Sequence, residues 1–110
     1  MNGKNKTTAE RPLHPHWLVM QKVDPDMLRK CTEWRGCIME HEAIPAKYKE
    51  LMMVSMCSVI RFTAGTKIHA QYAIEKGATK DELFEAIALS MLIGGVPAYR
   101  EGIMTINELI

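Results

Sequence analysis

The sequence predicts an all-α protein of about five helices. Apolar residues recur every three to four positions along most of the chain, which is the spacing of one face of a helix. Residues typical of helix ends separate these segments, namely Pro25, Pro45, Gly77 and Pro97. No segment competes well as a strand with alternating apolar and polar residues. We therefore expect helices joined by short loops.

Residues 1–16 are polar, and we expect them to form a mobile arm ahead of a single helical domain over residues 17–110. His14 and His16 flank Pro15 in this arm. Two histidines could bind a metal, but in a flexible segment they are more often simply solvated. The sequence therefore predicts no metal site here.

The first two predicted helices follow from their start signals. Asp24, Pro25 and Asp26 provide an N-cap, a proline at the first helical position and an acid near the positive end of the helix dipole. After a loop over residues 41–44, Pro45 starts a second helix that continues to about residue 60. That segment is apolar nearly all round, so we expect it to be the central, buried helix.

Three further helices are expected in the second half of the chain. One spans about residues 64–76 and stops at Gly77, a residue suited to a left-handed conformation. Thr79 and Glu82 have the spacing of a capping box and start the next helix. Gly94 and Gly95 end it, and Pro97 opens the last helix.

Composition limits the classes of function. The chain has 110 residues and 47% hydrophobic residues, and a chain this short leaves apolar surface exposed when alone, so we expect a homo-oligomer. With 14 basic and 13 acidic side chains it lacks the basic excess of a nucleic-acid-binding protein. No signal peptide and no apolar run of roughly 18 residues is visible, so we expect no membrane span and a cytoplasmic protein with reduced cysteines.

Glu50 and His69 are the residues best suited to chemistry. Each is a polar group within an apolar helical segment, and a carboxylate and an imidazole buried together can move a proton. Each also has a simpler interpretation. Glu50 lies near a helix start, where acids are favoured, and a lone histidine is more often a packed or surface residue.

The surroundings of His69 suggest a binding site. Gly65 lies one turn before His69, where it either marks the helix start or leaves space for a ligand that Phe62 would border. Cys57 shares a helix face with Glu50. It is either a buried small hydrophobe or, with Arg61 as a cationic neighbour, a reactive thiolate.

The stretches Lys49-Glu50-Leu51, residues 69–86 from His69 to Ala86, and Gly94-Gly95-Val96-Pro97-Ala98 carry a resemblance to a known family. Residues from about 25 to 108 resemble the carboxymuconolactone decarboxylase family, which includes the alkylhydroperoxidase D-like proteins. The resemblance implies an all-α homo-oligomer, commonly a trimer or a hexamer. Redox members carry Cys-x-x-Cys-x-x-x-His, but in this chain Phe62 and Gly65 stand at the two cysteine positions.

The resemblance implies that Glu50 and His69 relay protons, and that no metal or organic cofactor is needed. Three functions are compatible with it. The first is a cofactor-free lyase or isomerase acting on a small carboxylated lactone or organic acid, with Arg61 or Lys67 as carboxylate anchor and Phe62 and Gly65 beside the substrate. The second is a redox protein related to the peroxiredoxins with a displaced thiol at Cys57. The third is a non-catalytic structural or ligand-binding oligomer.

Overall fold

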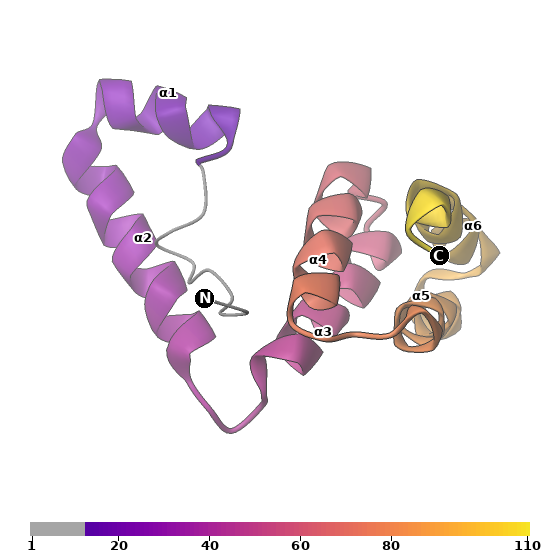
Figure 1. Ribbon diagram of the computed structural model, residues 1–110. Helices are drawn as coiled ribbons and strands as arrows, with labels where there is room; N and C mark the ends of the chain where they lie inside the picture. Colours follow the sequence, from indigo (N-terminus) through magenta and orange to yellow (C-terminus); the bar gives the residue numbers. More distant parts are fainter. Residues whose placement is uncertain (1–12) are drawn as a thin grey trace. The chain divides into compact units, whose positions relative to one another are not determined.

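A computed structural model describes residues 13–110, and these residues form helices and no strands, which confirms the all-α prediction (Figure 1). The elements in chain order are α1 (Pro15–Val23), α2 (Pro25–Glu40), α3 (Ala46–Val59), α4 (Thr63–Glu75), α5 (Lys80–Gly94), α6 (Val96–Thr105) and the short 3-10 helix η2 (Asn107–Leu109). None of the helices in this part of the chain is both long enough and apolar enough to cross a membrane.

The chain divides into two compact units at residues 43 and 44, within the predicted loop. All five expected helices are present as α2–α6, but α1 was not predicted. Pro15 was interpreted as part of a mobile arm, whereas it occupies the first position of α1. Proline is well suited there, because a backbone N–H at the first helical position has no partner within the helix. His16 therefore belongs to a helix, and residues 1–12 of the expected arm lie outside the described residues. The single domain over residues 17–110 stays a prediction.

In the first unit, α1 packs against α2. Asp24 joins them: its backbone N–H donates to the Met20 carbonyl at 2.7 Å, and its carboxylate accepts from the Met27 N–H at 3.0 Å. The guanidinium of Arg35 lies 4.8 Å from the centre of the Trp17 ring. Among the residues of α1 and α2, Leu28 alone is buried, so this pair has little core of its own.

In the second unit, α3 packs against α4, α5 and α6, as expected for the central helix. The shared core consists of Leu51, Val54, Ala70, Ala73, Leu83, Ala86, Ile87 and Ile106. The expectation that α3 is the central helix is confirmed, but it is buried along one side only. Met52 and Met56 are 50% and 58% exposed, because α3 has neighbouring helices along one side and not along the other.

The predicted start of α5 is confirmed in detail. The Thr79 hydroxyl accepts from the Glu82 N–H at 3.0 Å, and the Glu82 carboxylate accepts from the Thr79 N–H at 2.9 Å. The Thr79 backbone contact, together with the Lys47 ammonium at 3.1 Å, lowers the pKa of Glu82 below its usual value. The cap thereby fixes α5 against α3 as well as its own first turn.

Helices α3 and α4 end in the same hydrogen-bonded turn with different residues at the critical position. After α4, Gly77 has φ of 95° and donates to the Ile74 carbonyl, while the next residue, Ala78, donates to Ala73. After α3, Arg61 has φ of 57° in the equivalent position. Its N–H donates to Ser58, and the N–H of the next residue, Phe62, donates to Cys57. Gly77 is the predicted left-handed end of a helix. Arg61 adopts the same left-handed backbone conformation, which is unfavourable for a residue with a side chain.

We predict that Arg61→Gly raises the free energy of unfolding by about 0.5–1 kcal/mol. The left-handed conformation costs a non-glycine residue roughly 1–2 kcal/mol, and glycine avoids this cost. The greater flexibility of glycine in the unfolded chain offsets part of the stabilisation. Chemical denaturation measures the change. Arg100→Gly, the same substitution within α6, should instead lower stability by about 1 kcal/mol. A destabilised Arg61→Gly variant would contradict the prediction.

Candidate functional site

Glu50 lies in the second turn of α3 and its side chain is fully buried. Its carboxylate meets two groups of α4. Oε1 lies 2.8 Å from Nδ1 of His69, and Oε2 lies 3.3 Å from Nζ of Lys76. The structure therefore brings together the two residues that the sequence singled out, 19 positions apart, and adds a third. Glu50 lies beyond the first turn of α3, which contains no acidic residue, so the helix dipole contributes little at this position.

The face of α4 that meets Glu50 carries His69, Tyr72 and Lys76, which share it because they lie three and four positions apart. The rings of His69 and Tyr72 meet edge to face with 6.1 Å between centroids. The Lys76 ammonium lies 5.8 Å from the centroid of the Tyr72 ring. The His69 side chain is 24% exposed and that of Lys76 is 10% exposed, so the site opens to the outside at the imidazole.

A fully buried carboxylate is costly unless it is paired and hydrogen-bonded. Glu50 meets this condition by placing one carboxylate oxygen on each cationic or polar partner. The Lys76 ammonium donates to Oε2, and Nδ1 of His69 donates to Oε1 in the tautomer that carries its proton there. The arrangement holds an imidazole in a fixed orientation, with one ring nitrogen on the carboxylate.

Lys76 and Tyr72 were missed from the sequence. The signal for them was their spacing from His69, which places all three on one helix face. Lys76 precedes Gly77 and was interpreted only as the end of the helix. That interpretation accounts for its backbone, which caps α4, but the direction of its side chain depends on packing against α3.

The space expected beside Gly65 is not open. A Cβ on residue 65 would lie 2.5 Å from the Phe62 ring and 2.8 Å from Sγ of Cys57, so these two side chains fill it. This close packing at the turn that joins α3 to α4 favours the interpretation of Gly65 as the mark of a helix start, and its role beside a substrate stays a prediction. Phe62 itself is 54% exposed, and its role as a substrate contact stays a prediction.

The two candidate carboxylate anchors lie at different places around the start of α4. Arg61 is an exposed residue of the turn between α3 and α4. Lys67 is exposed on α4 and pairs with Glu108 at 3.1 Å, so binding a substrate through Lys67 requires competition with that carboxylate. Neither residue contributes to the contacts that join Glu50 to His69 and Lys76. Their binding roles stay predictions.

Cys31, Cys37 and Cys57 all carry free thiols. Burial raises the pKa of the Cys57 thiol above its usual value. A reactive thiolate requires the opposite shift, which a cationic neighbour would cause. The redox role of Cys57 therefore has no support from its surroundings.

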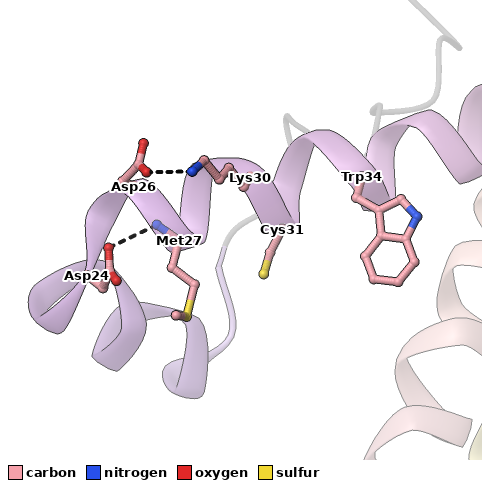
Figure 2. A pocket seen from close by; sticks show the side chains of 6 residues that line it. All are labelled: Asp24, Asp26, Met27, Lys30, Cys31 and Trp34. Atoms are coloured by element: carbon pink, nitrogen blue, oxygen red, sulfur yellow. Dashed lines mark hydrogen bonds and ion pairs between the residues drawn. The ribbon is translucent and has the colours of Figure 1, made fainter.

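Two hollows lie outside the Glu50 cluster. In the first unit, a hollow of about 300 Å³ runs along α2 past the Asp24 cap, the ion pair of Asp26 and Lys30, and the side chains of Cys31 and Trp34 (Figure 2). In the second, an apolar groove of about 600 Å³ lies between α3 and α5. Its lining residues are Tyr48, Leu51, Met52, Ser55, Met56, Glu82, Glu85, Ala86 and Leu89. Within residues 13–110, no group of three or more His, Cys, Asp or Glu side chains is arranged to hold a metal ion.

Comparisons with known proteins agree with this fold. A crystal structure from Burkholderia xenovorans LB400, of a protein provisionally named carboxymuconolactone decarboxylase, superimposes with a TM-score of 0.77 at 23% sequence identity. The match covers 94% of this chain and 82% of the other. No curated protein matches the chain significantly. The sequence profile of the carboxymuconolactone decarboxylase family matches residues 25–104. This chain therefore belongs to the carboxymuconolactone decarboxylase family.

Proposed function

We propose that this protein is a cofactor-free proton-transfer enzyme of the lyase or isomerase type, which acts on a small carboxylated lactone or a related organic acid. The observation that carries the proposal is the contact of 2.8 Å between the buried Glu50 carboxylate and the part-exposed His69 ring. A histidine oriented by a carboxylate is a common general acid or base near neutral pH. The name given to the structural relative from Burkholderia xenovorans LB400 agrees with this class of reaction.

The proposed chemistry needs one group that exchanges protons with the substrate. When a lactone that bears a carboxylate loses carbon dioxide, the electron pair left on the ring must accept a proton. The side chain of His69 is exposed enough to supply this proton. Glu50 is fully buried beside the imidazole, and its carboxylate compensates the positive charge of the protonated ring. Arg61 or Lys67 would hold a carboxylate of the substrate near the start of α4.

We predict that Glu50→Gln and His69→Ala each lower turnover of such a substrate by about 10²-fold or more, the usual worth of general acid–base catalysis. The measurement is proton NMR of a panel of carboxylated γ-lactones in D₂O, which detects both decarboxylation and deuterium incorporation. Glu75→Gln, on the exposed side of α4, and His41→Ala, in the exposed loop before α3, are matched controls and should retain full activity. Turnover that survives in both site variants would contradict the proposal and favour a non-catalytic role.

The displaced-thiol alternative makes a different prediction at Cys57. Because its pKa is raised by burial, less of its thiol is ionised at a given pH, and its alkylation should be slow. We expect iodoacetamide at pH 7 to label Cys57 about tenfold more slowly than the exposed Cys37, and its rate to keep rising above pH 9. Peptide mass spectrometry measures both rates. Labelling of Cys57 that is faster than that of Cys37 would support the redox alternative.

We also propose that copies of this chain assemble into a homo-oligomer through the groove between α3 and α5. Met52, Met56 and Leu89 on its walls are each at least half exposed, and monomeric proteins rarely leave a large continuous apolar surface uncovered. A second copy is the occupant implied by the small size of the chain, which limits the core that it can build alone.

We predict that the double substitution Met52→Glu and Met56→Glu converts the oligomer into monomers. It places two negative charges on successive turns of α3 in the apolar groove, where a second copy would bury them without partners. Sedimentation velocity measures the molecular mass. Met104→Glu, at an exposed methionine of α6 outside the groove, is the matched control and should leave the mass unchanged. A monomeric wild-type protein, or an unchanged oligomer in the double variant, would contradict this assembly.

A further inference from the structure

One face of α2 carries an apolar stripe with the spacing of a coiled coil. Its residues are Met27, Cys31, Trp34 and Ile38, and we call them the α2 stripe. They lie four, three and four positions apart, as do the core positions of a heptad repeat. Met27, Trp34 and Ile38 are 50%, 70% and 51% exposed. The stripe therefore has the form of a helix face that packs against another helix.

The hollow along α2 has the form of a hole in coiled-coil packing. In such packing, a core side chain of one helix inserts between four residues of the facing helix. Neighbours on a helix surface lie three and four positions apart, so the four residues have positions i, i+3, i+4 and i+7. Four of the six residues that line the hollow of about 300 Å³ have this spacing, namely Met27, Lys30, Cys31 and Trp34. Figure 2 shows Met27, Cys31 and Trp34 pointing to the same side of α2.

The lining of this hole suits an indole ring. The thioether of Met27 makes favourable contacts with aromatic rings, and the Lys30 ammonium can lie against an aromatic face. An indole also needs an acceptor for its N–H when it is buried, and the carboxylates of Asp24 and Asp26 line the same hollow. An apolar floor with carboxylates beside it thus matches both parts of a tryptophan side chain.

The tryptophan that can enter the hole is Trp34 of a second copy. The chain has two tryptophans, and the ring of Trp17 already lies 4.8 Å from the Arg35 guanidinium within the first unit. Trp34 is the more exposed ring and belongs to the α2 stripe itself. Because the hole and the indole lie side by side on one helix face, two copies can exchange them around a two-fold axis.

Charges at the edges of the stripe set the direction of the pairing. In a parallel pair, Lys30 would lie opposite Arg35 of the second copy, at the two positions that flank a coiled-coil core. Like charges at these positions oppose pairing. In an antiparallel pair these two residues are not opposite each other. Met27 then faces Ile38 of the second copy, and each Trp34 lies over the other hole.

We infer that the α2 helices of two copies pair antiparallel through the α2 stripe, with each Trp34 inserted into the hole of the other copy. The inference rests on the proposed homo-oligomer, because α2 has 16 residues and a seam this short is a weak contact by itself. Copies held together by the groove between α3 and α5 raise the local concentration of α2 and so allow the pair to form. The pair supplies apolar contacts to a unit in which, among the residues of α1 and α2, Leu28 alone is buried.

The test is disulfide trapping in the full chain. Met27→Cys and Ile38→Cys are combined with Cys31→Ala and Cys37→Ala, and the protein is mildly oxidised. Eleven positions separate residues 27 and 38, about 16 Å along a helix, whereas a disulfide needs Cα atoms within roughly 7 Å. A bond between them therefore joins two copies. We expect a covalent dimer on a non-reducing gel, with the peptides that contain residues 27 and 38 linked in the mass spectrum.

Two further variants test the role of the indole. Trp34→Ala in the same chain removes the inserted side chain and should lower the yield of this bond about tenfold, since tryptophan anchors commonly dominate an interface. Glu33→Ala changes an exposed neighbour that lies off the stripe and should leave the yield unchanged. A yield that is equal in these two variants would contradict the insertion of Trp34.

Tryptophan fluorescence gives a second measure without new cysteines and decides the question if the trapping variants do not fold. Trp17→Phe leaves Trp34 as the single tryptophan. Acrylamide should quench Trp34 strongly at dilutions where sedimentation shows monomers and weakly where it shows the oligomer. Equal quenching in the two states would overturn the inference.

The outcomes separate this pair from the groove. An oligomer that forms no bond between residues 27 and 38 overturns the α2 pair alone. Bonds that join 27 to 27 or 38 to 38 indicate parallel helices and also overturn it. A monomeric chain without the bond rejects both contacts. A bond that persists when Met52→Glu and Met56→Glu are added supports the α2 pair and rejects the groove as the contact that holds the copies together.

Discussion

The burial of the Glu50 carboxylate is the constraint on which the site depends. A fully buried acid must be matched by donors, and the donors His69 and Lys76 both come from one face of α4, at positions separated by two turns. This match fixes the rotation of α4 about its axis and its register along α3. It also orients the His69 ring with one nitrogen on the carboxylate and the other side toward the exposed edge of the unit. The same interaction therefore serves the packing of the helices and the proposed chemistry.

The ends of α3 and α4 place the site within this packing. Both helices end in the same type of hydrogen-bonded turn. The turn after α4 holds Lys76. The capping box of Thr79 and Glu82 then starts α5, with Thr79 two residues after Gly77. The first turn brings Phe62 and Cys57 against Gly65, where their side chains fill the space that a larger residue would need. The chain thus has a carboxylate and an imidazole in contact, and close packing of Phe62 and Cys57 against Gly65 at the turn before α4.

Both units of the chain leave much apolar surface exposed. The first unit buries Leu28 alone among the residues of its two helices, and the central helix of the second unit leaves methionines half exposed along the groove beside α5. Neither feature suits an isolated chain, because exposed apolar area of this extent weakens a small domain.

The sequence by itself determined the helices, their ends and the two residues that carry the proposed chemistry. These are local properties: the capping box needs two suitable residues three positions apart, Gly77 needs its own backbone freedom, and the family motif preserves the spacing of Glu50 and His69. The sequence was misleading at Pro15, because a proline at a helix start and a proline in a flexible arm have the same local signature. Only the tertiary structure decided that Lys76 reaches Glu50, that Phe62 and Cys57 fill the space beside Gly65, and that Arg61 adopts a left-handed conformation. These outcomes depend on how α3 and α4 pack, and the direction of a long side chain or the size of a space between helices is fixed by that packing and not by the residues nearest in the chain.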